Sequence, residues 1–491
     1  MSTAEGQGFA RGALSFSAIV ALGAAVGLFV TPFTTRMFDP ATLGKINMFG
    51  AYLALLQIVS LVGLDQGYMR FYSDSPNSAS RLLLLRHCLM RSVLAWALVG
   101  VAAWLLWEPI SIGIVGMPQA EIPAILIAAL LGSVVFRYAQ VWSRVAGRAR
   151  DFLLLTVAFA VLTKISIVLA GIVDSGYLSG IMFLGVGYVV AGIYALVTLR
   201  QARTTADAEI ATPPAGRPLL AYSFPFLVTG LLGLASTSLV SIPVERILGF
   251  EAVGVFYAGL SLASFVAVVQ MGIQSYWSPY AYAVHRSGAD SLRAAQQAVA
   301  LVICSVGLLC VVATPLLFLL LGAAFRGAAE FFGLLVAPPV LTLLGEVGGV
   351  GLLLAKRSWA YSASQIVGAV VTVGCCLWLV PGRGLVGAGM AMTLGALITA
   401  VLRITMARSH FRPFARPVLA TVTIALFLGA ASLQAVPAMP SGTPVVLCAA
   451  ACLAVVLVIN RSDVARIAVA SRRELLTLLS RLRGASVDNR R

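Results

Sequence analysis

Very few side chains in this sequence carry charge inside a long apolar run, and Lys164 is the most isolated of them. It lies in LLLTVAFAVLTKISIVLAGIV, about 18 Å from one end of its run and about 14 Å from the other at 1.5 Å per helical residue. A lysine side chain does not reach the membrane surface easily over that distance. We therefore expect Lys164 to line a water-filled, functional lumen and to bind substrate; a structural ion pair is the alternative.

Two further ionisable residues fall inside apolar runs. Arg137 starts a stripe at helical spacing with Gln140, Arg144 and Arg148, but it lies only about 10 Å from the end of its run. Snorkelling and lumen lining, as a second substrate-binding cation, both stay open for it. Glu346 is the only acid that the sequence places deep in a run, among the glycines of GEVGGVG. It is a candidate proton carrier for coupling, and a protonated structural carboxyl is the alternative.

A helix-end pattern occurs twice, about 210 residues apart. It reads TPFTTRMFDPATLG at 31–44 and IPVERILGFEAVG at 242–254, with Arg36 and Arg246 each eight residues before a glycine. We interpret both as helix ends followed by a short loop, in which the glycine permits a tight turn. The pair predicts a duplicated half, with chance similarity as the alternative. Arg36 and Arg246 then stand at outer helix ends, as interface anchors or as guides for substrate.

The elements that position these residues are predicted to be membrane-spanning helices. Of the 491 residues, 60% are hydrophobic and 11% are charged, whereas soluble domains carry about a quarter charged residues. About fourteen runs are long enough to span a bilayer as helices, and they are too long for barrel strands. The fold class is therefore an all-α polytopic membrane protein. The predicted spans are 12–36, 46–64, 88–107, 122–144, 152–173, 180–199, 219–243, 252–275, 296–320, 332–355, 359–380, 385–406, 417–436 and 443–460.

The net charge of +16 follows the predicted loops and does not indicate a nucleic-acid ligand. Cytoplasmic loops of membrane proteins carry the excess of lysine and arginine, so both termini are predicted to be cytoplasmic. Arg403 is counted among the inner residues in this assignment. The outer side receives only five basic residues, which are Arg36, Lys45, Arg246, Arg326 and Arg383.

The predicted spans divide into two lobes of six helices in parallel repeat. The longest polar stretch within the chain falls after six helices, where a linker would join two bundles, and transporters are often built from such repeats. The tail places leucines and valines on one helical face with arginines around it, which is typical of a helix on anionic lipid. The predicted parts are 1–200 and 218–408 as lobes, 201–217 as the linker, 409–460 as two additional helices and 461–491 as a cytoplasmic amphipathic tail.

Motifs of enzymes and cofactor sites are absent from the sequence. There is no GxxxxGK[ST] phosphate loop and no HExxH, and the seven cysteines form no CxxC pair. The three histidines all fall near inner helix ends. We therefore expect no enzyme, no cofactor and no metal site. The glycines around Glu346 lack the dinucleotide-binding spacing and indicate close helix packing or hinging.

Six motifs, in order along the chain, resemble those of the Wzx-type polysaccharide-biosynthesis flippases of the multidrug/oligosaccharidyl-lipid/polysaccharide (MOP) exporter superfamily. The Glu245–Arg246 pair stands where this family often has Asp-Arg. The motifs cover most of the first twelve predicted helices. They are PFTTRMFDPATLGKINMF (32–49), GLDQGYMRFYSD (63–74), SFPFLVTGLLG (223–233), ERILGFEAVGVFYAGLSLAS (245–264), SYWSPYAY (275–282) and VPGRGLVGAGMAM (380–392).

The resemblance implies two six-helix lobes around a cationic cavity in a bacterial cytoplasmic membrane. It also implies that an undecaprenyl-pyrophosphate-linked oligosaccharide crosses from the inner to the outer leaflet, with a polysaccharide polymerase and chain-length proteins as further partners. Lys164 and Arg137 fit such cargo, since a pyrophosphate needs charge compensation in a low-dielectric layer. A cation-coupled drug exporter of the same superfamily is the first alternative, and a membrane polymerase or ligase is the second.

Overall fold

The computed structural model describes residues 26–465 except for 28, 73, 76, 205–215, 236–237, 286–288, 356 and 434–442. The predicted amphipathic tail beyond residue 465 and most of the predicted linker lie outside the described residues. Every regular element in the described part of the chain is helical. Ten of the described helices are long and apolar enough to cross a membrane, so the chain is a multi-pass membrane protein, as predicted.

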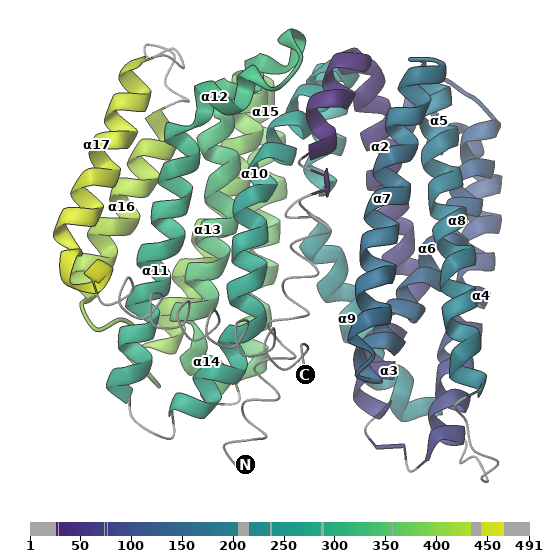
Figure 1. Ribbon diagram of the computed structural model, residues 1–491, viewed down its shortest axis with the longest axis horizontal. Coiled ribbons are helices and arrows are strands. Elements are labelled where there is room, and N and C mark those ends of the chain that lie inside the picture. The colour runs from purple at the N-terminus through teal and green to yellow at the C-terminus, as the bar shows by residue number, and fades with distance from the viewer. Residues whose placement is uncertain are drawn as a thin grey trace, which may run out of the picture.

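The helices gather into two groups that stand side by side in Figure 1. The first group holds α2 (Pro40–Leu61), α3 (Leu64–Tyr72), α4 (Ser78–Leu105), α5 (Trp107–Val115), α6 (Glu121–Val145), α7 (Ala149–Val173) and α8 (Tyr177–Thr204). The second holds α10 (Ser241–His285), α11 (Ala289–Val312), α12 (Thr314–Leu319), α13 (Phe332–Gly348), α14 (Val350–Leu354), α15 (Ser358–Ala407), α16 (Pro417–Leu433) and α17 (Thr443–Ile459).

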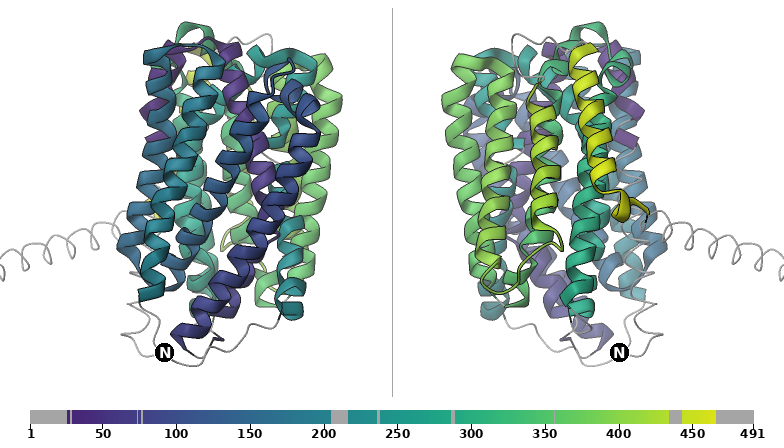
Figure 2. Two further views of the ribbon diagram at one scale, coloured as in Figure 1. Left: turned by 90° about the vertical axis from the view of Figure 1, so that its right-hand side faces the viewer. Right: turned by 90° about the vertical axis from the view of Figure 1, so that its left-hand side faces the viewer.

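Helix α9 (Gly216–Ala235) packs against both groups. It contacts α2 and α3 of the first group and α15 of the second. Helices α16 and α17 pack on α11 at the outer side of the second group, as the right-hand view of Figure 2 shows. We call the end of the molecule where α4 begins and α8 ends the basic end, because exposed arginines gather there, and the other end the opposite end.

Two of the second group's elements, α10 and α15, each consist of two helices that meet at a glycine with non-helical backbone angles. Helix α15 contains both predicted spans, 359–380 and 385–406, joined at a sharp kink where Gly384 has a φ of 57°. Its N-cap Arg357 has φ −91° and ψ 58°, close to the values of Arg148 before α7. These two residues are 209 positions apart, so equivalent helices of the two groups start in the same way.

Each copy of the pattern holds a helix end, as predicted, but the non-helical break is shorter than predicted, since it covers 38–39 in the first copy and Gly249 in the second. Asp39 caps α2 by accepting a 3.0 Å hydrogen bond from the Thr42 backbone N–H, and Pro40 occupies the first helical position. Proline is favoured there because its missing N–H has no helical partner. Helix α2 therefore starts within the predicted loop, and Gly44 lies inside it. Helix α10 likewise runs through 242–254, with its kink at Gly249.

The glycines of the two copies allow α2 and α10 to cross at backbone distance. A Cβ atom on Gly44 would overlap the carbonyl oxygen of Phe250, and one on Gly254 would overlap that of Pro40. The two contacts are equivalent, because Gly254 lies 210 residues after Gly44 and Phe250 lies 210 residues after Pro40. The pattern thus occurs twice because its copies are the two halves of one contact, which we call the glycine crossing. It lies at the opposite end.

Other predicted boundaries shift for local reasons. Helix α4 starts ten residues before the predicted span 88–107, because Asn77 caps it by accepting a 2.8 Å hydrogen bond from the Ser80 backbone N–H. Arg81 and Arg86 therefore belong to a helix and not to a loop. The predicted span 219–243 ends early, since α9 stops at Ala235 and α10 begins at Ser241.

Candidate functional site

Arg137 forms a buried ion pair with Asp65 within the first group. Its Nε and Nη2 both donate to Asp65 Oδ2, at 2.9 Å and 2.7 Å, while Nη1 donates to Gln140 at 3.3 Å. The Asp65 side chain is 7% exposed and that of Arg137 is 35% exposed. Two hydrogen bonds from one guanidinium fix its orientation. Arg137 is therefore held inside the bundle and does not snorkel to the helix end.

Glu346 is paired within the second group. Its Oε1 accepts hydrogen bonds from Gln274 Nε2 at 2.5 Å and from the Tyr361 hydroxyl at 3.1 Å, and Arg403 Nη1 lies 3.8 Å away. The Arg403 guanidinium also stacks 3.8 Å from the centroid of the Tyr361 ring. Glu346 thus has one cation and two neutral donors around it.

Arg403 is a buried residue, although the sequence analysis counted it with the basic residues of the inner side. Its side chain is 3% exposed, and it lies inside α15, within the predicted span 385–406. Its Nε donates to Ser364 at 3.1 Å and its Nη2 to Gln365 at 2.9 Å. A buried guanidinium needs such partners to offset its desolvation.

The buried pairs of the two groups occupy equivalent positions. Asp65 and Arg137 are 72 residues apart, and so are Gln274 and Glu346. Each member of the second pair lies 209 residues after its counterpart, the same shift that relates Arg148 and Arg357. The charge on α6 is positive, and the charge at the matching place on α13 is negative with Arg403 as its counter-ion. One architecture therefore carries two different electrostatic arrangements.

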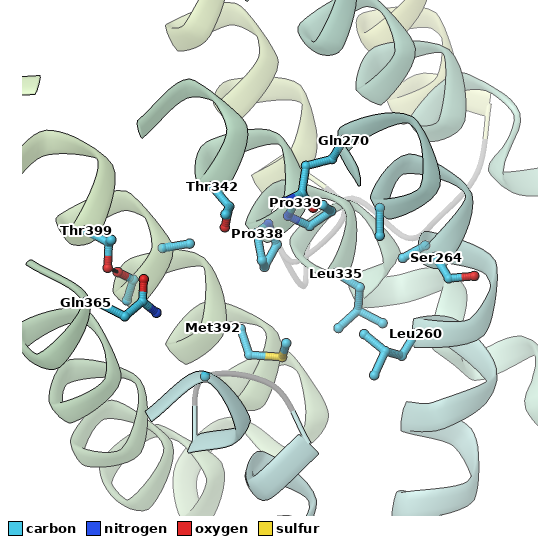
Figure 3. Close-up of a pocket in the computed structure, with 15 residues that line it drawn as sticks. Leu260, Ser264, Gln270, Leu335, Pro338, Pro339, Thr342, Gln365, Met392 and Thr399 are labelled. Carbon is cyan, nitrogen blue, oxygen red and sulfur yellow. Dashed lines mark hydrogen bonds between the residues drawn. The ribbon is translucent and has the colours of Figure 1, made fainter. Parts of the chain in front are cut away.

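A cavity of about 390 Å³ lies in the second group, between α9, α10, α13 and α15. Figure 3 shows Leu260, Leu335 and Met392 on its apolar walls. Its polar groups are hydroxyls and side-chain amides without formal charge, and they come from Ser264, Gln270, Thr342, Gln365 and Thr399. The lining suits an uncharged, hydrogen-bonding ligand.

Hydrogen bonds connect this cavity to the buried pair behind it. Gln270 in the wall donates from its Nε2 to Gln274 Oε1 at 3.2 Å, and Gln274 donates in turn to Glu346. On the other side, Gln365 in the wall accepts from Arg403. The Glu346–Arg403 pair therefore fixes the orientation of both wall amides. The Gln365 carbonyl oxygen accepts from Arg403 directly, and the Gln270 amide is linked to Glu346 through Gln274.

Lys164 lies in mid-helix on α7. The residue is exposed. Its Cε lies 3.6 Å from where a Cβ on Gly27 would stand. Four residues on, the Thr31 hydroxyl meets the Ser261 hydroxyl of α10 at 2.5 Å. Within the described part of the chain, Lys164 forms no hydrogen bond and no ion pair.

Arg36 and Arg246 both lie at the opposite end, close to the glycine crossing, and both are exposed. Neither forms an ion pair with another described residue. Lys45 of α2 lies 4.2 Å from the Tyr177 ring centroid and 5.6 Å from that of Phe250. This end of the molecule therefore carries cations on both sides of the contact between the groups.

Two buried charged residues escaped sequence reasoning. Asp65 stands in GLDQGYMRFY, outside the predicted spans, but α3 buries it to 5% exposure. Arg403 lies inside its predicted span, 385–406, but was counted with the inner basic residues. The usable signal for Asp65 is the spacing of two glycines: Asp65 lies two residues after Gly63, and Gln274 lies two residues after Gly272.

The fold, two groups of membrane-spanning helices side by side, is shared with solved membrane proteins. The structure of "Lipid II flippase MurJ, inward closed conformation" matches with a TM-score of 0.63 and 11% identity, over 92% of this chain and 99% of that one. An inward-facing multidrug resistance MATE family transporter of the MOP superfamily matches with a TM-score of 0.58 and 14% identity, over 82% and 97%. No protein-family model matches the sequence, and no curated protein matches it. At these identities the likeness establishes the fold alone.

Proposed function

We propose that this protein flips an undecaprenyl-pyrophosphate-linked oligosaccharide from the inner to the outer leaflet of a bacterial cytoplasmic membrane. In this proposal the lobes 1–200 and 218–408, joined by the linker 201–217, open alternately to the two sides. The helices of 409–460 add to the second lobe. The basic end and both termini are cytoplasmic, because lysine and arginine gather on that side. A polysaccharide polymerase and chain-length proteins receive the exported units.

The observation that carries the proposal is the unpaired Lys164. A cation in the middle of a membrane-spanning helix is costly unless an anion or water compensates it. No described residue supplies that anion, so a transported anion can. A pyrophosphate group provides two phosphates for this purpose, and a charge pair at about 4 Å is worth about 4 kcal/mol at an effective dielectric of about 20.

The buried acids support a flippase over a cation-coupled drug exporter. A site for cationic drugs needs carboxylates that are free to attract the drug. Asp65 is occupied by Arg137, and Glu346 by Arg403, Tyr361 and Gln274. The uncharged hydroxyl and amide lining of the second-lobe cavity suits sugar hydroxyls instead. In this proposal Lys164 binds the pyrophosphate, Arg137 lies in the same lobe as a second cation, and the cavity receives the sugar.

A direct test uses the purified protein in liposomes with a lipid-pyrophosphate-linked oligosaccharide that carries a fluorescent sugar. Membrane-impermeant dithionite quenches probe in the outer leaflet only. We expect the quenched fraction to rise above that of protein-free vesicles, since flipped probe becomes accessible. No rise, together with uptake of a cationic dye by the same vesicles, would assign the protein to the drug exporters.

Opening at the opposite end requires the glycine crossing to separate. We expect Gly254→Ala to favour the open state, because its Cβ would overlap the carbonyl oxygen of Pro40 and overpacking costs about 1–3 kcal/mol. Ser261→Cys, about two turns after Gly254 on the same helix, should then react faster with a water-soluble maleimide than it does without Gly254→Ala.

Gly272→Ala is the matched control for this experiment. Gly272 lies in the same helix, and a Cβ there meets nothing within 4 Å. It should leave the labelling rate of Ser261→Cys unchanged. Equal labelling in both alanine variants would show that the crossing does not control access at this end.

A further inference from the structure

The first lobe has a groove on its surface, near the basic end, that no step of the proposed transport uses. It measures about 260 Å³ and is lined by residues of α4 and α8 alone. Helix α6 packs between these two helices, and all three lie together at the right of Figure 1. The groove is therefore a gap between two helices that both pack on α6.

Leucines form most of the groove's walls. Leu82, Leu85 and Leu89 follow one another at helical spacing on α4, and Leu196 and Leu199 do so on α8. Residues three and four apart share one helical face, so each helix turns a continuous apolar stripe to the groove. Leu196 is 45% exposed. Such a surface suits a hydrocarbon chain.

Two arginines complete the lining. Arg86 comes from α4, about 12 Å along the axis from its start at Ser78, and Arg200 comes from α8, about 6 Å before its end at Thr204. Both side chains are exposed. They come from helices that run in opposite directions, so the fold itself brings both guanidinium groups to one place.

Neither arginine has an acidic partner among the described residues. Four other arginines at this end do, and they are exposed or half-buried as well. The pairs are Arg70–Asp74, Arg148–Asp151, Arg293–Asp290 and Arg416–Asp463. Arg86 and Arg200 are thus two converging cations with no protein anion, beside a wall of leucines.

We infer that this groove binds one anionic phospholipid of the leaflet at the basic end. The headgroup phosphate lies between Arg86 and Arg200, where guanidinium groups can donate paired hydrogen bonds to its oxygens. One acyl chain follows the leucine stripes toward the membrane centre. The inference does not depend on what the protein transports, because the groove belongs to one lobe and Lys164 is not part of its lining.

The test measures lipid binding by the full-length protein in detergent with native mass spectrometry. Phosphatidylglycerol and phosphatidylcholine of identical acyl chains are titrated in turn. We expect phosphatidylglycerol to bind more tightly, since its net charge is negative. Arg86→Gln and Arg200→Gln should each weaken that binding about fivefold, and the double variant about thirtyfold. Arg86→Lys with Arg200→Lys should retain part of it.

Arg408→Gln is the matched control, because Arg408 is exposed at the basic end and lies outside the groove. It should leave phosphatidylglycerol binding unchanged. Equal binding of the two lipids by the parent protein, or an equal loss in Arg408→Gln, would overturn the inference. Displacement of phosphatidylglycerol by micromolar inorganic pyrophosphate would also overturn it and assign the groove to a pyrophosphate headgroup.

Discussion

Lys164→Met is expected to lower transport at least tenfold while the protein remains folded and abundant in the membrane. Methionine keeps an unbranched side chain, one atom shorter, and removes its charge, so the cargo loses an attraction of about 4 kcal/mol at an effective dielectric of about 20. Because Lys164 has no partner among the described residues, its removal leaves no protein charge uncompensated. The liposome assay measures transport, and thermal unfolding in detergent measures stability.

Lys164→Arg tests whether transport needs only the positive charge or also the shape of the lysine side chain. It should keep part of the activity, since the positive charge survives while the planar guanidinium replaces the ammonium. Normal transport by Lys164→Met would remove this residue from the substrate path. If Lys164→Met unfolds at a lower temperature, and the loss of folded protein accounts for the whole loss of transport, Lys164 is instead a structural cation.

The second large effect is expected at Arg403. Arg403→Met should destabilise the protein by about 3–5 kcal/mol, because Glu346 would stay buried without its counter-ion. Glu346→Gln combined with Arg403→Met should recover most of this loss, since both charges are then absent. The midpoint of thermal unfolding in detergent measures the effect.

Arg408→Met, at an exposed position at the end of the same helix, is the control and should stay within about 0.5 kcal/mol of the parent. If the double variant were as unstable as Arg403→Met alone, the pair would not be the source of the stability.

The same variants also test whether transport is coupled to protons. Glu346 as a proton carrier stays a prediction, and loss of pH-gradient dependence in Glu346→Gln would support it.

The sequence alone determined the class of the protein and the depth of its central lysine. Composition and the length of apolar runs are local properties, and a bilayer admits few ways to satisfy the backbone of such a run. Hence the all-α fold is confirmed, and α6, α7 and α8 begin and end within a few residues of the predicted spans. The sequence also exposed the repeated pattern around Gly44 and Gly254, but not that its two copies contact each other.

Only the tertiary structure decided which residues meet. Asp65 with Arg137, Glu346 with Arg403, and Gly44 with Phe250 join segments far apart in the chain. Their pairing depends on how each helix is rotated about its axis. In a soluble protein the alternation of polar and apolar residues reveals that rotation. In a membrane both the packed face and the lipid-facing face are apolar, so the sequence carries almost no record of it, and the partners of a buried charge emerge only when the helices pack.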